Sequence, residues 1–450
     1  MASSGYSTFN AATLLARFDF SSHQDILHTS QLSPSKATTL LDRIYDYLQD
    51  HAPGSAEYPH VLRLLQDCCY HTGAFPTLLI IPHITFSRDQ PFKRGGEATL
   101  YHGRMAERHV AVRELFVAAR ESEKDARHFA IQLVHREAIV HSQLHHPNIL
   151  PFLGIYYEGA SAHPLVILPF LERGSLEKLL ADLNGKLMKQ SDLIMILAGL
   201  ARGLVYLHSR GPPIIHGDLQ PGNVLINNLG NPVLCDFGLG RIRHEISRSC
   251  TDHINGGRLR FVAPELWDLA GSSQQSDVFA LAMTYLNAWS GQPPFPEISQ
   301  EWRVASELSK GSRPAKPLKA VVLGHEVEAE FWKLLESMWV HQASNRPLSG
   351  QVLDNFEHIF KPLKQHLPST QPTPAYLPSD EFHISSAILP PPDISSSPRN
   401  FRSPHAQTAL HNLPYTGEAS QYLWDHRPEN LCLSGTREAV LNALINWAEG

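Results

Sequence analysis

The sequence predicts an α+β fold in which a small β-rich lobe is followed by a larger helical lobe. Short runs rich in Val, Ile, Leu and Tyr, at 78–81, 99–101 and 110–112, alternate with Gly and charged turns, a pattern typical of an antiparallel sheet. Farther along, apolar residues recur at helical spacing over longer segments, notably 191–208 and 276–289. At roughly 150 residues per domain, the 450 residues predict three units, or one large domain with appendages.

A helical hairpin is expected ahead of the β-rich lobe, within residues 31–80. Apolar positions recur at helical spacing on both sides of a turn at Pro53-Gly54, which predicts two helices. These positions are Leu40, Leu41, Ile44, Tyr45 and Leu48 in the first helix and Tyr58, Val61, Leu62, Leu65 and Cys69 in the second. Residues 1–30, rich in Ser, Thr and Ala, are expected to be a flexible N-terminus. Two roles for the hairpin stay open: packing on the β-rich lobe or recruiting a partner.

A disordered tail is expected after the helical lobe, over residues 363–434. Residues 368–404 contain 9 Pro and 8 Ser among 37 residues, a composition with too little apolar surface to form a core. A C-terminal amphipathic helix is expected within residues 435–450. Its apolar stripe consists of Val440, Ala443, Leu444 and Trp447. Such a helix can dock back on the protein or bind a partner.

The composition argues against several classes of protein. Lys and Arg number 38 against 44 Asp and Glu, and the resulting net charge of −6 argues against a partner that is a nucleic acid. The chain is 42% hydrophobic, enough for a core, but no apolar run is long enough for a membrane span. Its five Cys are scattered and odd in number, so neither disulfides nor a zinc site is expected. Since no signal-peptide pattern is present, a cytoplasmic location is expected, with the nucleus as the alternative.

The most informative stretch is a set of three motifs in the helical half of the chain. They are His216-Gly217-Asp218-Leu219-Gln220-Pro221-Gly222-Asn223, then Asp236-Phe237-Gly238, then Ala263-Pro264-Glu265. In this order and at these spacings they resemble the catalytic loop, the magnesium loop and the end of the activation segment of protein kinases. The resemblance implies a bilobal protein kinase domain over residues 81–362. It also implies ATP and Mg²⁺ as cofactors, with a protein substrate or signalling partner.

The resemblance gives the residues of these motifs separate roles. Asp218 would accept or orient the proton of the acceptor hydroxyl, and the oxygens of Asn223 and Asp236 would hold Mg²⁺, a hard cation that prefers oxygen ligands. Gln220 stands where Ser/Thr kinases have a Lys that assists the transferred phosphate. Arg258 stands where they have a Thr, and one hypothesis is that it supplies part of the missing charge.

A second group of candidate residues lies upstream. The run Val110-Ala111-Val112-Arg113 resembles the kinase strand whose last residue is normally a Lys that reaches the ATP phosphates and pairs with a helix Glu. Glu137 falls on the apolar stripe of a helix expected over 125–144. An inward-facing carboxylate needs a cation, and we expect Arg113 to supply it.

The nucleotide-binding residues implied by the resemblance surround the same strand. Gly95 and Gly96 would let the backbone approach phosphate, although only the middle one of the family's three loop glycines is kept. Leu168 resembles the gatekeeper of the hinge, whose backbone from Pro169 to Leu171 would contact adenine. The full set is Gly95, Gly96, Leu100, Ala111, Arg113, Leu168, Pro169 and Leu171.

Other residues resemble features of the family outside the reaction. Asp277 and Arg346 resemble structural anchors of the helical lobe, and in the family the arginine pairs with the glutamate that corresponds to Glu265. His216 to Leu219, the Gly-Gly loop and Leu259 to Glu265 most resemble the tyrosine-kinase-like group of mushroom-forming fungi.

Two functions from different classes stay open. Because Asp218, Asn223 and Asp236 are all present, the preferred interpretation is an active kinase that phosphorylates Ser or Thr. The alternative is a pseudokinase that binds nucleotide or acts as a scaffold. It is favoured by the degraded glycine loop and by the replacement of two Lys residues: the guanidinium of Arg113 is wider and planar, and Gln220 lacks the positive charge. The oligomeric state is left open.

Overall fold

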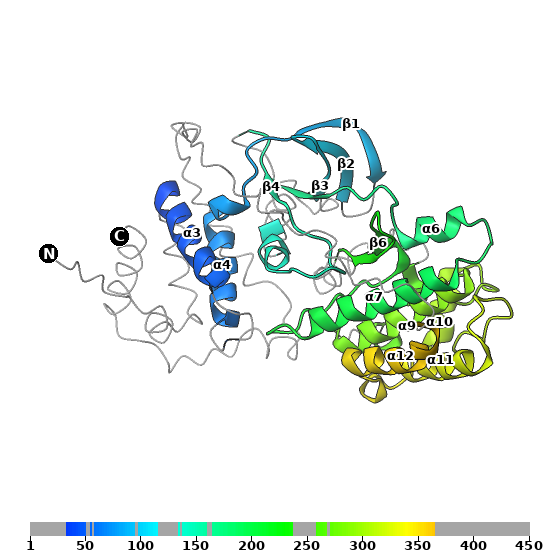
Figure 1. The fold of residues 1–450 in the computed structure, drawn as a ribbon. Helices are drawn as coiled ribbons and strands as arrows, with labels where there is room; N and C mark the ends of the chain where they lie inside the picture. The colour runs from blue at the N-terminus through cyan, green and yellow to red at the C-terminus, as the bar shows by residue number, and fades with distance from the viewer. Residues whose placement is uncertain are drawn as a thin grey trace, which may run out of the picture.

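The molecule consists of a β-sheet lobe, a helical lobe and an N-terminal helical hairpin (Figure 1). This computed structural model describes residues 33–50, 55, 58–94, 98–115, 134–135, 137–159, 164–236, 258–267 and 271–364. The predicted α+β fold, with a small β-rich lobe before a larger helical one, is confirmed. The flexible N-terminus expected at 1–30, the tail beyond residue 364 and the helix expected within 435–450 lie outside the described residues.

The small lobe is built on a five-stranded antiparallel sheet with the order β1-β2-β3-β5-β4. The strands are β1 (Thr85–Arg94), β2 (Ala98–Met105), β3 (Arg108–Leu115), β4 (Gly154–Tyr156) and β5 (Leu165–Pro169). The pairing of β1 with β2 shifts register on both sides of Pro91, a residue that cannot donate a ladder hydrogen bond. The β2 and β3 strands pair without such a shift, so the sheet is regular around Arg113.

The register of the sheet separates its two faces. Val110 and Val112 of β3 pack with Ile167 of β5 in one apolar cluster. Since side chains alternate along a strand, Ala111 and Arg113 lie on the opposite face. Ala111 there joins a second cluster that includes Leu168. The sheet therefore presents the expected nucleotide-binding side chains on one face only.

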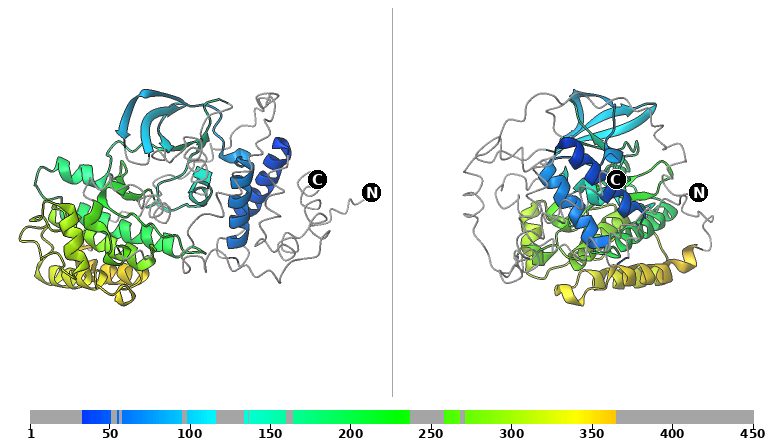
Figure 2. Two further views of the ribbon diagram at one scale, coloured as in Figure 1. Left: turned by 180° about the vertical axis from the view of Figure 1, so that it is seen from behind. Right: turned by 90° about the vertical axis from the view of Figure 1, so that its left-hand side faces the viewer.

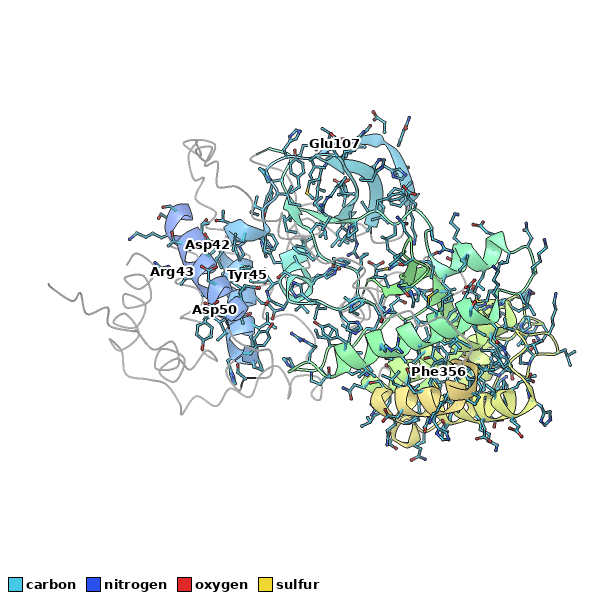
Figure 3. The ribbon with its side chains drawn as sticks, in the orientation of Figure 1. Asp42, Arg43, Tyr45, Asp50, Glu107 and Phe356 are labelled. Atoms are coloured by element: carbon cyan, nitrogen blue, oxygen red, sulfur yellow. The ribbon has the colours of Figure 1, made fainter. Side chains whose placement is uncertain are left out.

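The predicted hairpin is present as α3 (Pro34–Asp50) and α4 (Tyr58–Thr72), which pack on each other and on the small lobe. Figure 2 shows the two helices at the end of the molecule opposite the helical lobe. A short 3-10 helix, η1 (Thr77–Leu79), leads from α4 to the sheet. Asp42 of α3, labelled in Figure 3, accepts hydrogen bonds from the backbone N–H and hydroxyl of Thr77 at 2.5 and 2.8 Å. Of the two roles left open for the hairpin, packing on the lobe is realised in this structure.

The helical lobe is built around two buried helices. Its helices are α6 (Leu176–Asp182), α7 (Gln190–His208), α9 (Gln274–Ser290), α10 (Glu301–Ser309), α11 (His325–Met338) and α12 (Ser349–Lys364). Every residue of α9 from Ser276 to Ser290 is buried. The helix begins with a capping box between Ser273 and Ser276, and it ends at Gly291, whose φ of 70° is readily reached by glycine. The predicted helices at 191–208 and 276–289 are confirmed as α7 and α9.

Helix α7 is the described helix that is long and apolar enough to cross a membrane. Of its apolar window, 67% is buried inside the protein, where α7 contacts α9 and α12. A buried core helix can be as long and as apolar as a membrane-spanning helix. The length and composition of α7 are therefore only weak evidence for a membrane span.

Short elements lie along the chain between the helices of the helical lobe. They are η2 (Pro221–Asn223), β6 (Val224–Ile226), β7 (Pro232–Leu234), η4 (Arg258–Phe261), η5 (Pro264–Leu266) and η6 (Ala343–Asn345). Strand β6 pairs with β7. The segment that precedes β4 is tied to β7, because Leu150 donates its N–H to Leu234 and Leu234 donates to Asn148, each at 2.9 Å. The small lobe is thereby linked to the loop that carries Asp236.

Candidate active site

The loop that carries Asp218 is bonded through its backbone to a buried carboxylate on α9. Asp277, 1% exposed, accepts hydrogen bonds from the backbone N–H groups of His216 and Gly217 at 2.7 and 2.8 Å. His208 at the end of α7 contacts the same carboxylate through Nε2 at 2.9 Å. Gly217 has a φ of 73°, a left-handed conformation that favours glycine at this turn. Asp277 is thus an anchor of the loop, as expected from the sequence.

Three polar side chains converge on the carboxylate of Asp218. Its Oδ1 accepts hydrogen bonds from Arg258 Nε at 2.7 Å and from Gln220 Nε2 at 3.1 Å. Asn223 Nδ2 donates to Oδ2 of Asp218 at 2.7 Å and to its backbone oxygen at 2.9 Å. The side chain of Asp218 is only 7% exposed. A carboxylate held from two sides is restricted in orientation, as a group that must aim at one proton needs to be.

Asp236 is brought beside Asn223 by the residue that precedes it. The backbone N–H of Cys235 donates to the backbone oxygen of Asn223 at 3.0 Å. Asp236 itself has a φ of 58°, a left-handed conformation that is uncommon for a residue with a side chain. Conformations of this kind occur where surrounding structure holds them, and they cluster at functional sites.

Asn223 and Asp236 form the donor set best suited to a divalent cation. Because the amide nitrogen of Asn223 donates to Asp218, its amide oxygen remains the atom that could bind a metal. Mg²⁺ commonly binds one or two protein oxygens and completes its shell with water and phosphate, so this pair fits it. In the part of the chain that the structure describes, no cluster of three or more His, Cys, Asp or Glu side chains offers a metal site.

The expected ion pair between Arg113 and Glu137 is present and buried. Nη1 of Arg113 lies 2.5 Å from Oε1 of Glu137, and the two side chains are 4% and 6% exposed. Nη2 of the same guanidinium lies 3.4 Å from Oδ1 of Asp236. Burial lowers the pKa of Arg113, but the carboxylates of Glu137 and Asp236 outweigh it, and the net pKa is raised. The guanidinium therefore stays charged and links β3 to two separate segments.

The expected nucleotide-binding residues share one face of the sheet. Leu100 lies opposite Arg113 in the β2–β3 pair, and Ala111 lies opposite Leu168 in the β3–β5 pair. Directly opposed residues point to the same side of a sheet, so these four side chains lie on the face of Arg113. Pro169, the last residue of β5, and Leu171, two residues later, are half-buried. Gly95 and Gly96 lie outside the described residues.

The pair Glu265 and Arg346 lies in the helical lobe, away from Asp218. Arg346 donates to both carboxylate oxygens of Glu265, at 2.6 and 2.8 Å, and to three backbone oxygens of the lobe. A fully bonded, buried guanidinium of this kind supports the fold, which agrees with the structural role expected for both residues.

One contact of the site was not expected as such. The sequence identified Arg258 as a replacement of Thr, but nothing in it indicated a direct bond to Asp218, 40 residues earlier. A pair of substitutions could have indicated this contact. Gln220 is neutral where Ser/Thr kinases have a Lys, and Arg258 is cationic where they have a Thr.

The chain matches a family model and several kinases. A model described as the protein kinase domain matches residues 91–356. Serine/threonine-protein kinase 12 of Arabidopsis thaliana is 29% identical over 255 residues, which are 56% of this chain and 51% of that protein. Serine/threonine-protein kinase RUNKEL of the same plant is 33% identical over 58% of this chain and 18% of its own length.

A third relative is described as a dual specificity kinase. Dual specificity protein kinase splA of Dictyostelium discoideum is 26% identical over 51% of this chain and 10% of its own length. The chain thus spans about half or less of the length of these curated relatives. They do not test the resemblance to kinases of mushroom-forming fungi, which stays a prediction.

Proposed function

This chain belongs to the protein kinase family, and from that premise we propose that it is an active kinase that phosphorylates Ser or Thr hydroxyls of protein substrates. The observation that carries the proposal is the convergence of Asp218, Asn223 and Asp236 with the buried pair of Arg113 and Glu137. These residues come from four segments of the chain. Asn223 bonds Asp218, and Arg113 contacts both Glu137 and Asp236, which supports a role for these residues in phosphoryl transfer.

In the proposed reaction, Asp218 orients the acceptor hydroxyl and receives its proton. The hydroxyl oxygen bonds to the γ-phosphorus of ATP, the bond from that phosphorus to the ADP oxygen breaks, and ADP keeps the electron pair. Asn223 contributes by fixing the carboxylate of Asp218 through Nδ2. Bound Mg²⁺, held by Asn223 and Asp236, would supply positive charge to the phosphates.

Arg113 would bind ATP phosphate from the sheet side. Glu137 orients its guanidinium, and Leu100, Ala111 and Leu168 offer an apolar surface on the same face for the base. A planar guanidinium is wider than an ammonium, so the phosphates would lie somewhat differently than over a Lys.

The alternative function, a pseudokinase, is favoured by one contact. Nη2 of Arg113 lies 3.4 Å from Oδ1 of Asp236, so the guanidinium already neutralises the carboxylate that would hold the metal. A chain in which Arg113 keeps that position would bind nucleotide weakly and act through its shape.

Transfer of phosphate from γ-labelled ATP with Mg²⁺, to the chain itself and to a generic protein substrate, separates the two functions. We expect labelling by the wild type that falls by at least 10²-fold in Asp218→Asn. Asp354→Asn, on the exposed side of α12, is the matched control and should keep wild-type labelling. Labelling that is equal in the wild type and Asp218→Asn, or absent from both in folded protein, would support the pseudokinase.

A further inference from the structure

Arg258, a cation that contacts Asp218, lies in η4, 40 residues later in the chain. Among the three side chains that bond its carboxylate, Gln220 and Asn223 are neutral, and Arg258 carries the charge. The neutral Gln220 and the charged Arg258 bond the same oxygen, Oδ1. They therefore stand at one side of the group that receives the proton.

The turn that carries Arg258 is firmly attached to the helical lobe. In η4, the side chain of Arg260 is buried and donates to the backbone oxygens of Pro294, Phe295 and Ile298 at 2.7, 2.8 and 2.6 Å. Phe261 is buried in the core of the same lobe. Arg258 lies two residues before Arg260, so its backbone is held in place by this attachment. Its charge is therefore positioned without the entropic cost of ordering a loop.

The contact with Asp218 uses only one end of the guanidinium. Asp218 is bonded by Nε, whereas a guanidinium has five N–H donors in a planar fork. The side chain of Arg258 is 38% exposed, compared with 7% for Asp218. Arg258 is therefore partly accessible to solvent while its Nε holds Asp218.

We propose that Arg258 is the positioning residue of this site: it holds Asp218 through Nε and supplies the positive charge that Gln220 does not. The inference rests on the proposed kinase function. During transfer, negative charge on the phosphoryl oxygens remains beside Asp218, and a preorganised cation there stabilises the transition state. If Arg258 only blocked Asp218, it would slow the reaction. Removing Arg258 would then raise kcat, whereas removing a stabilising cation lowers kcat.

The test compares five forms of the full chain in phosphate transfer from ATP. They are the wild type, Arg258→Gln, Arg258→Lys, Gln220→Lys and the double variant Arg258→Gln with Gln220→Lys. We expect Arg258→Gln to lower kcat by about 10²-fold while KM for ATP stays near the wild-type value, as for the loss of one electrostatic contact in the transition state. Arg258→Lys keeps the positive charge but loses the planar arrangement of donors. Its kcat should lie between those of the wild type and Arg258→Gln.

Rescue by Gln220→Lys is the decisive measurement. The double variant should have a kcat at least tenfold higher than that of Arg258→Gln alone, because Gln220→Lys returns a cation to the same carboxylate oxygen. In the wild type it should have little effect. Arg303→Gln, on the exposed face of α10, removes the same charge elsewhere and should leave kcat unchanged.

Each result decides the matter. A wild type that transfers phosphate and keeps or gains activity in Arg258→Gln overturns the role of Arg258 alone, as does a loss that Gln220→Lys does not rescue. A wild type that transfers no phosphate overturns both this inference and the proposed kinase function.

Discussion

Arg113 and Asp236 are in contact, with Nη2 of the guanidinium 3.4 Å from Oδ1 of the carboxylate. The same guanidinium bonds Glu137, so one side chain of β3 joins the helix segment of the small lobe to the loop expected to hold the metal. A Lys ammonium is a compact point charge without a second arm. The contact to Asp236 is therefore a specific consequence of Arg at this position, and it can be tested by substitution.

Arg113→Lys is expected to improve nucleotide binding. The ammonium of Lys can keep the ion pair with Glu137, but it has no second nitrogen to contact Asp236. The carboxylate of Asp236 then becomes available to the metal. KM for ATP, measured by initial rates at varied ATP with fixed Mg²⁺, should fall severalfold. A higher KM in Arg113→Lys would contradict this role of the guanidinium.

Arg113→Met is expected to destabilise the small lobe strongly. It leaves the buried carboxylate of Glu137 without this cation, and breaking one side of a buried pair costs about 3–5 kcal/mol. Urea denaturation measures the free energy of unfolding. The double variant with Glu137→Leu should recover part of the loss, and a double variant that is no more stable than Arg113→Met would disprove the pair as the cause.

Asp277→Asn is expected to lower both stability and kcat. The carboxylate accepts from the backbone of His216 and Gly217, and an amide nitrogen cannot accept one of these bonds. A hydrogen bond to a charged group contributes about 1.5–3 kcal/mol, so a loss of this size should appear in the free energy of unfolding. Since the loop carries Asp218, kcat should fall more than KM for ATP rises. Unchanged kcat in folded Asp277→Asn would show that the loop holds its position without this anchor.

Leu65→Ala is expected to cost about 2–5 kcal/mol of stability, as for other buried Leu residues that are truncated. Leu65 of α4 is buried in the apolar cluster that also contains Ala138 and Ile139, next to Glu137 in sequence. Leu78→Ala is the matched control, since Leu78 of η1 is 60% exposed and should contribute little. If chemical denaturation gave the two variants equal stability, the hairpin would not be part of the small lobe in solution.

The stability of the protein is expected to fall below pH 6.5, in part because of His141. Burial lowers the pKa of His141 to about 4 from an ordinary value of 6.5, even though Nε2 donates to the backbone oxygen of Leu150 at 2.6 Å. Between these values the unfolded chain binds a proton that the folded chain does not. Stability is therefore full above pH 6.5 and decreases as the pH falls to about 4, by about 1.4 kcal/mol per unit for this residue.

Urea denaturation of the wild type and His141→Gln at pH 7 and pH 5 measures this contribution. Gln can donate to Leu150 but does not titrate, so the variant should lose less stability between the two pH values than the wild type. An equal loss in both proteins would assign the pH dependence to other groups.

Several parts of the site were predictable because their signals are local in the sequence. The residues of the loop from His216 to Asn223 lie within one short motif, and Glu137 could be assigned to a buried face by helical spacing alone. The resemblance of residues 110–113 to the kinase strand identified Arg113, and the cation that a buried carboxylate needs identified Glu137 as its partner. These inferences combine motifs that resemble those of protein kinases with helical spacing and the cost of burying charge.

Other contacts depend on distant segments and could not be predicted in this way. Arg258 meets Asp218 because Arg260 fixes its turn to the oxygens of residues 294–298, and no local pattern encodes that attachment. Likewise, the apolar positions of α3 and α4 predicted the two helices but left open whether they pack on the β-rich lobe or recruit a partner.

The sequence by itself determined the order of the lobes, the helices with their apolar faces and the motifs that resemble those of protein kinases. Only the tertiary structure decided that the small lobe covers the hairpin, that Arg113 reaches Asp236 and that Arg258 bonds Asp218. The physical reason is that periodicity and side-chain chemistry are properties of short segments. Pairing between distant segments depends instead on which surfaces fit when the whole chain packs.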